Sequence, residues 1–108
     1  MVEIPDASIQ QFRDNAQKIY EELLFILVRK QIDYGPYNVL NAPGGPINGL
    51  LVRISDKIER LKNLIYNPKT ADPQFESIED SFIDLANYAI IALMVQRNIW
   101  NAHVKENI

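Results

Sequence analysis

The sequence predicts an all-α fold with three principal helices, and three observations indicate this class. In three separate stretches, apolar residues recur every three or four positions, which is the period of a helix. Two segments rich in turn formers separate these stretches, at residues 33–46 and 67–75. No stretch alternates apolar and polar residues in the way a half-buried strand does. With 108 residues in total, we expect one helical domain over residues 1–108.

The first helix is expected from Ala7 to about Ile32, with Asp6 or Ser8 as its N-cap. Gly35–Pro36 should end it, because glycine readily closes a helix and proline cannot continue one. Its main apolar stripe consists of Ile9, Phe12, Ala16, Ile19, Leu23, Ile26 and Leu27. Three further apolar residues, Leu24, Phe25 and Val28, lie outside this stripe and predict burial on two sides.

The second helix is expected over Ile47–Ile65. Its apolar stripe consists of Ile47, Leu50, Leu51, Ile54, Ile58, Leu61 and Ile65. Arg53, Lys57 and Arg60 flank this stripe. A charged flank is typical of a solvated face with pairs four residues apart, such as Asp56–Arg60. The same cations are also suited to holding the charge of a phosphate group.

The third helix is expected from Ile78 to about Trp100, with Ser77 and Asp80 forming its cap. One side carries Glu76, Asp80 and Asp84 at spacings of four, and Asn87 and Tyr88 continue it. The opposite side, which we expect to face the core, carries Ile78, Phe82, Leu85, Ala89 and Leu93. Beyond Tyr88 the acidic side turns apolar, so we expect the acids to enter a covered region. A divalent cation or basic side chains would neutralise them there.

Composition excludes several classes of function. The net charge of −3 and the pI near 5.0 argue against a nucleic-acid partner. The absence of cysteine excludes disulfides and thiolate chemistry. The apolar runs are too short to span a bilayer, and the N-terminal residues lack the pattern of a signal peptide. We therefore expect a soluble cytoplasmic protein without a membrane partner, located in the host cytoplasm if a phage encodes it.

The remaining motifs are weak by themselves. Gly44–Gly45 lacks the lysine of a phosphate-binding loop, and the one histidine, His103, lies near the C-terminus. The segment at 33–46 holds Tyr34, Tyr37 and Asn38, which can stack on a ligand and hydrogen-bond to it. A connector whose aromatic rings pack on the core is the alternative interpretation of this segment.

Three segments together resemble the phage and bacterial nucleotide modification associated domain group. They read KQIDYGPYN (30–38), GLLVRISDKIERLKNL (49–64) and ESIEDSFIDLANYAIIAL (76–93). That group is similar to the all-α nucleoside triphosphate pyrophosphohydrolases of the MazG-like and dimeric dUTPase class. The resemblance implies a MazG-like helical bundle that hydrolyses a (deoxy)nucleoside triphosphate to monophosphate and pyrophosphate. It also implies Mg²⁺ as the cofactor, with Mn²⁺ as an alternative.

Carried onto this chain, the resemblance and the acidic stripe predict site residues of three kinds. The metal ligands are expected at Glu76, Asp80 and Asp84, and the catalytic residues at Asp56, Glu59 and Asp80. Phosphate and nucleoside contacts are expected from Tyr34, Asn38, Arg53, Lys57, Arg60, Asn87 and Tyr88.

The chain departs from the enzymes' motifs. In place of EExxE it offers Glu21–Glu22 followed by Phe25, or Asp56 followed by Glu59. In place of ExxD, Ser81 stands three residues before Asp84. Two alternatives to hydrolysis therefore stay open. One is a non-catalytic helical oligomer that binds or sequesters nucleotides or binds a protein partner. The other is a bundle whose acids pair with Arg53, Lys57 and Arg60 across helices.

The supply of apolar residues exceeds what one three-helix core needs. Ile83, Ile90, Ile91, Met94 and Val95 lie outside the main stripe of the third helix. Because a helix that is apolar all round should be buried all round, we expect a homo-oligomer, either a dimer or a tetramer. Such an interface could bring the 34–38 segment of one copy towards the acids of another.

Overall fold

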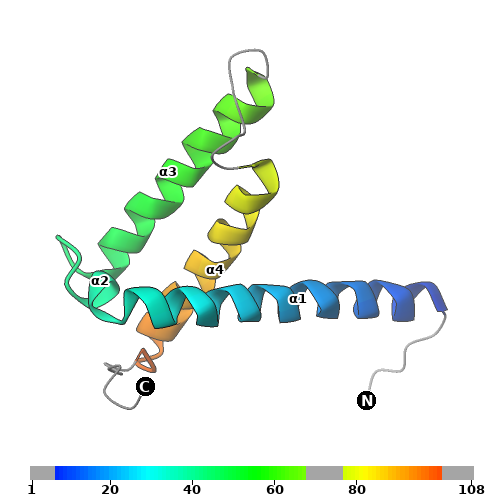
Figure 1. Cartoon of the computed structure of the whole chain (residues 1–108), viewed down its shortest axis with the longest axis horizontal. Helices are drawn as coiled ribbons and strands as arrows, with labels where there is room; N and C mark the ends of the chain where they lie inside the picture. The colour runs from blue at the N-terminus through cyan, green and yellow to red at the C-terminus, as the bar shows by residue number, and fades with distance from the viewer. Residues whose placement is uncertain (1–6, 68–76, 101–108) are drawn as a thin grey trace.

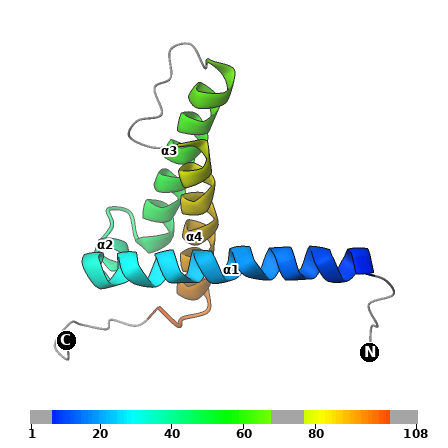
Figure 2. The ribbon, with the colours of Figure 1, turned by 45° about the vertical axis from the view of Figure 1, so that its right-hand side comes forward.

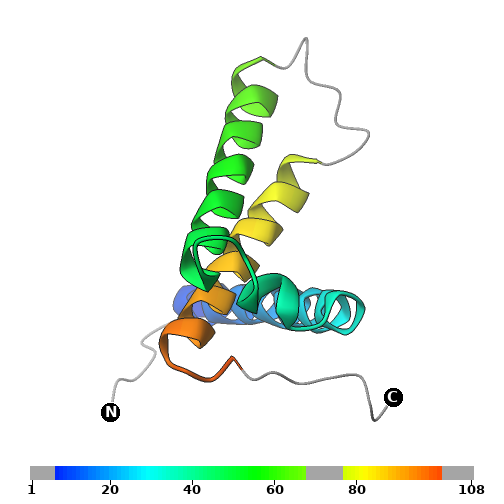
Figure 3. The same cartoon turned by 90° about the vertical axis from the view of Figure 1, so that its left-hand side faces the viewer.

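The computed structural model describes residues 7–67 and 77–100, which form four α-helices. In chain order these are α1 (Ala7–Tyr34), α2 (Tyr37–Leu40), α3 (Pro46–Tyr66) and α4 (Ile78–Gln96). Helices α3 and α4 lie side by side and run in opposite directions, and α1 crosses α4 (Figure 1, Figure 3). The N-terminal half of α1 projects beyond both of them (Figure 1, Figure 2). The predicted all-α class and its three long helices are confirmed.

The segment between α1 and α3 is more ordered than the sequence predicts. Helix α1 continues two residues past Ile32 and ends before Gly35, whose φ of 71° is a left-handed conformation that suits glycine. The prediction of a loop throughout 33–46 was wrong, because Tyr37–Leu40 form the single turn α2 and bury Val39. Gly45 then precedes Pro46, whose fixed φ suits the first position of a helix.

Both ends of α4 are defined by local chemistry. At its start, the Ser77 hydroxyl accepts a hydrogen bond from the Asp80 amide, and the Asp80 carboxylate accepts one from the Ser77 amide. This confirms the predicted cap. The predicted end at Trp100 was wrong. The helix stops at Gln96 because Asn98 adopts a left-handed φ of 57°, which turns the chain back.

The main cluster of buried residues lies at one end of the molecule, and Leu61 and Leu64 are buried separately, further along α3. Val39 of α2, Leu50 of α3 and Ile91 of α4 form the centre of the main cluster. Partly buried side chains surround them: Leu27, Tyr88, Ala92, Val95 and Trp100. The Trp100 indole also donates a hydrogen bond to the Pro36 carbonyl oxygen at 3.4 Å. These contacts fix α2 and the end of α1 against α3 and α4.

The apolar side of α4 does not face this core, so that prediction was wrong. Phe82 and Leu93 are 54% and 47% exposed, whereas Ser81, Asn87 and Ile91 are buried. The physical reason is that α1 and α3 both pack on the polar side of α4. Four of the five stripe residues therefore stay exposed: Ile78, Phe82, Ala89 and Leu93. None of the described helices has the length and apolarity needed to cross a bilayer.

Candidate functional site

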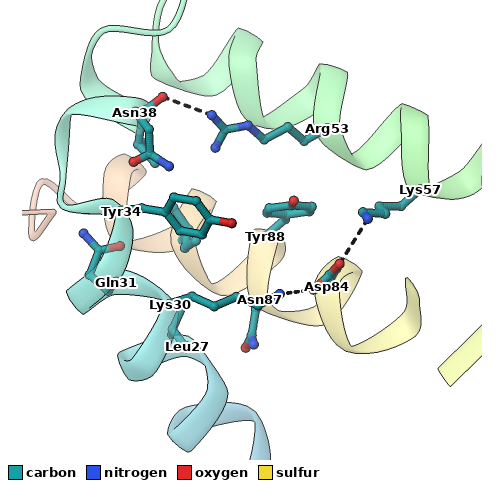
Figure 4. Close-up of a pocket in the computed structure, with 12 residues that line it drawn as sticks. Leu27, Lys30, Gln31, Tyr34, Asn38, Arg53, Lys57, Asp84, Asn87 and Tyr88 are labelled. Carbon is teal, nitrogen blue, oxygen red and sulfur yellow. Dashed lines mark hydrogen bonds and ion pairs between the residues drawn. The ribbon is translucent and has the colours of Figure 1, made fainter. Parts of the chain in front are cut away.

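A pocket of about 360 Å³ lies where the C-terminal part of α1 meets α2, α3 and α4 (Figure 4). Its walls consist of Leu27, Lys30, Gln31, Tyr34, Asn38, Val39, Arg53, Lys57, Asp84, Asn87, Tyr88 and Ile91. The volume falls in the range typical of small-molecule sites. The walls include every predicted substrate-binding residue except Arg60, which is partly buried further along α3. The structure thus brings together side chains that lie up to 64 positions apart in the chain, from Leu27 to Ile91.

Two lysines converge on one carboxylate at one end of this pocket. Lys30 Nζ of α1 lies 2.8 Å from one oxygen of Asp84, and Lys57 Nζ of α3 lies 3.1 Å from the other. Burial alone raises the pKa of Asp84, but the hydrogen bonds and charges of both lysines outweigh it and leave that pKa below its ordinary value. The hydrogen bond to Asp84 raises the pKa of Lys30. Asp84 and Lys30 are therefore both charged at neutral pH.

The opposite end of the pocket is set by Arg53. Its Nη2 donates a hydrogen bond to the backbone oxygen of Asn38 at 3.1 Å, which holds α2 against α3. Tyr34 and Tyr88 lie between this end and the Lys30–Asp84 pair (Figure 4). The pocket therefore carries three cationic side chains and one carboxylate, although the chain as a whole is acidic. This local excess of positive charge favours an anionic ligand.

Asn87 borders the pocket, but its amide contacts the protein backbone. Its Nδ2 donates to the Leu23 carbonyl oxygen of α1 at 3.3 Å. The amide points towards α1 and away from the two tyrosines (Figure 4). Its Oδ1 is buried and accepts no hydrogen bond from any residue that the structure describes. In this conformation, Asn87 joins α1 to α4 at the base of the pocket.

The other predicted acids lie outside the pocket. Asp80 is exposed in the cap of α4, and Glu76 falls outside the described residues. Asp56 and Glu59 are exposed on α3, where Glu59 accepts a hydrogen bond from Lys62 at 3.1 Å. Five acidic positions were predicted for metal binding or catalysis, and four of them are among the described residues. Of these four, only Asp84 lines the pocket.

The described residues of one chain do not form a magnesium-binding set in this conformation. Within 7–67 and 77–100, no three His, Asp or Glu side chains gather as metal ligands. Both oxygens of Asp84 are already paired with lysines, whereas Mg²⁺ needs free oxygen ligands. We therefore derive no chemical step through a cation. The Mg²⁺ or Mn²⁺ site stays a prediction, since Glu76 lies outside the residues described here.

Sequence reasoning missed Lys30 and Gln31 as pocket residues. A signal for Lys30 was present, because it lies four residues before Tyr34 and therefore on the same face of α1. The prediction extended this helix only to about Ile32, which placed Tyr34 in a loop. The shared face of Lys30 and Tyr34 was therefore not visible.

The fold and pocket define a small helical domain with a cationic, tyrosine-lined pocket. The chain belongs to the family described as Nucleotide modification associated domain 1, which matches residues 30–95. This confirms the predicted domain group. The matched segment contains every wall residue of the pocket except Leu27. No curated protein and no solved structure matches the chain. The predicted relation to MazG-like enzymes stays a prediction.

Proposed function

We propose that the pocket binds a nucleotide. The observation that carries this proposal is the placement of Lys30, Arg53 and Lys57 around Tyr34 and Tyr88 in one pocket. Cationic side chains bind phosphate oxygens through charge-assisted hydrogen bonds, and aromatic rings stack on nucleobases. The family description, which refers to nucleotide modification, supports the same class of ligand.

The phosphate is proposed to bind at the two lysines. Lys57 is only 19% exposed, so its charge is partly shielded from water and attracts an anion more strongly than a surface lysine does. In the structure, Asp84 supplies that anion. A phosphate group carries more charge and more acceptor oxygens than one carboxylate. It can therefore share or replace these contacts.

The nucleoside is proposed to lie against the tyrosines. Tyr34 is 66% exposed, so its ring is accessible, and Tyr88 is partly buried beside the core. The side chain of Asn38 has both donor and acceptor groups for the edge of a base. Its backbone oxygen is held by Arg53, so the residue is already positioned.

Hydrolysis of a nucleoside triphosphate to monophosphate and pyrophosphate is the second candidate function. The observation that favours it is Asp84, a carboxylate next to the proposed phosphate position. A further set of acids would have to join Asp84 to hold Mg²⁺, and Glu76 and Asp80 are the predicted members. Pyrophosphate release from a panel of (deoxy)nucleoside triphosphates, with and without Mg²⁺ or Mn²⁺, measures this activity directly.

The binding proposal is tested by titration calorimetry with a nucleoside, its monophosphate and its triphosphate. Lys57→Met keeps most of the length of the side chain and removes the charge. Loss of a charge-assisted hydrogen bond should raise the Kd of the monophosphate by about 10- to 150-fold. Lys62→Met is the matched control, because Lys62 lies on the same helix, pairs with Glu59 and is 56% exposed.

The two phosphorylated ligands should bind more tightly than the nucleoside, and Lys62→Met should match the wild type. Equal affinity for the nucleoside and the monophosphate would refute phosphate recognition. Equal losses in Lys57→Met and Lys62→Met would indicate a general charge effect instead of a site. Far-ultraviolet circular dichroism confirms that each variant keeps its helices.

A further inference from the structure

The N-terminal half of α1 carries an apolar stripe that the described part of its own chain leaves uncovered. Ile9, Phe12 and Ile19 are 47%, 70% and 54% exposed, and the neighbouring Tyr20 is 68% exposed. This half of the helix projects away from α3 and α4 (Figure 1, Figure 2). A large apolar surface on a single helix marks a contact site, because in water such a surface is unfavourable.

This stripe continues into an apolar groove between α1 and α4. The groove has a volume of about 560 Å³ and is bordered by Ile19, Glu22, Leu23, Ile78, Glu79, Phe82, Ile83 and Ala86. Phe82 and Ile78 are 54% and 40% exposed there. The outward side of α4 and the free half of α1 thus form one continuous surface. It lies outside the set of residues that line the nucleotide pocket.

We infer that the occupant of this surface is the N-terminal half of α1 from a second copy of the chain. The spacing of the stripe supports this choice. Ile9, Phe12, Ala16, Tyr20 and Leu23 are separated by three, four, four and three residues, which is symmetric about Ala16. Two copies in antiparallel orientation would meet at Ala16 and place Phe12 of each against Tyr20 of the other. A two-fold interface requires this kind of self-complementarity.

The geometry of this pairing also fills the groove. With Ala16 at the two-fold axis, Ile9 of one copy lies opposite Leu23 of the other, and Leu23 borders the groove. The small Ala16 side chain allows the two helices to approach closely at their crossing point. Each copy therefore supplies the apolar segment that the groove of the other copy lacks.

The available area is sufficient for a stable dimer. A large apolar side chain contributes roughly 100 Å² when it is buried. Six exposed residues take part in each copy: Ile9, Phe12, Ile19, Tyr20, Ile78 and Phe82. Across two copies they bury roughly 1,200 Å² before any polar contact is added, which reaches the size of a standard protein interface.

The first test measures mass by sedimentation equilibrium. The wild type should have twice the monomer mass of 12.4 kDa at micromolar concentration. Phe12→Glu buries a charge in both halves of the interface and should raise the dimer Kd by about 100-fold or more. Tyr66→Glu is the matched control, because Tyr66 is 75% exposed at the far end of α3 and should leave the dimer intact.

The second test locates the two-fold axis in a nearly native protein. Because the chain has no cysteine, a single introduced cysteine reports one position. Under mild oxidation, Ala16→Cys should form a disulfide-linked dimer. Lys18→Cys should not, since it lies on the opposite face of α1.

A wild-type monomer would overturn the inference, and so would one that associates only with a different protein. A Phe12→Glu variant that remained dimeric would also overturn it, because the dimer would then use another surface, such as Leu24, Phe25 and Val28. Equal cross-linking at positions 16 and 18 would contradict the antiparallel pairing. None of these results depends on nucleotide binding.

Discussion

The two halves of α1 have the same helical period but different surroundings. In the C-terminal half, Leu27 packs against the core and Lys30 reaches Asp84 across the pocket. In the N-terminal half, Phe12 and Tyr20 have most of their surface exposed to solvent, at 70% and 68%. The family match begins at residue 30 and so includes only the last five residues of α1, Lys30–Tyr34. The C-terminal half of the helix lines the pocket, and the N-terminal half carries the exposed stripe that we propose as a dimer surface.

This contrast shows what an apolar stripe does and does not indicate. Its period predicts the helix, because a helix brings every third or fourth residue to one side. The period does not say whether the cover comes from the same chain. In this protein, Leu23 is buried within the chain while Ile9 and Phe12 on the same stripe are exposed. The apolar stripe of α4 likewise predicts the helix correctly, yet Phe82 and Leu93 on it are exposed.

The largest expected effect is the loss of stability when a core residue, rather than a residue of the exposed stripe, is shortened. Leu50 is 2% exposed and is part of the core centre, so Leu50→Ala should lower the free energy of unfolding by about 2–5 kcal/mol. This loss should be the same at every protein concentration. Phe12→Ala should instead make the melting temperature depend less strongly on protein concentration, because association causes that dependence and the substitution weakens association. Thermal unfolding over a concentration series checks both. If Phe12→Ala instead lowered stability equally at every protein concentration, Phe12 would act as a core residue and the difference between the two halves of α1 would be refuted.

A smaller effect is expected from removing the internal anion of the pocket. Asp84→Asn keeps the shape of the side chain and releases Lys30 and Lys57 for a ligand. Calorimetry should show tighter monophosphate binding by about 5-fold, or about 1 kcal/mol, after solvent screening is allowed for. Asp14→Asn, the same change in the N-terminal half of α1, should leave affinity unchanged.

The same variant distinguishes the two roles proposed for Asp84. If Asp84 were a ligand of Mg²⁺, Asp84→Asn would weaken nucleotide binding in the presence of the cation. Tighter binding with and without Mg²⁺ would assign Asp84 as a counter-ion of the lysines. Weaker binding only with Mg²⁺ would restore the metal-site prediction.

The smallest expected effect is a pH dependence of stability at the pocket. The pKa of Asp84 is lowered in the folded state, so its contribution is present above its ordinary pKa of 3.8 and is lost as pH falls through the lowered value. The pKa of Lys30 is raised, so its contribution is present below 10.5 and is lost as pH rises through the raised value.

The difference in melting temperature between wild type and Asp84→Asn should therefore be constant from weakly acidic to weakly alkaline pH. It should shrink as pH falls below about 4. The pair is partly exposed, so the difference itself should be small. A difference that grew on acidification would contradict the assignment of Asp84 as an ion-paired carboxylate.

Much of the fold was predictable because its signals are local. The turn at Gly35, the proline at the start of α3 and the Ser77–Asp80 cap all depend on residues close together in the chain. The early end of α4 at Gln96 was missed, since only the left-handed backbone of Asn98 marks it. The short helix α2 was missed because Val39 is held by tertiary burial and not by a repeating pattern.

The candidate site was predictable in its residue types but not in its pairing. Arg53, Lys57, Asp84 and Tyr88 were expected near one another, and they line one pocket. The partner of Asp84 was expected to be a cation or a basic residue of the second helix, and Lys57 fits the latter expectation. Lys30 joins them only because α1 crosses α4, and a crossing angle leaves no mark in the sequence (Figure 2).

The most direct test of the separation between site and surface is a nitrogen-15 NMR titration of the wild type with a nucleoside monophosphate. The amide shifts should move around Lys30–Asn38, Arg53–Lys57 and Asp84–Tyr88. The amides of Ile9–Tyr20 should keep their positions throughout. The result that would contradict the account is a set of shifts centred on the N-terminal half of α1, or no shifts in the pocket at saturating ligand.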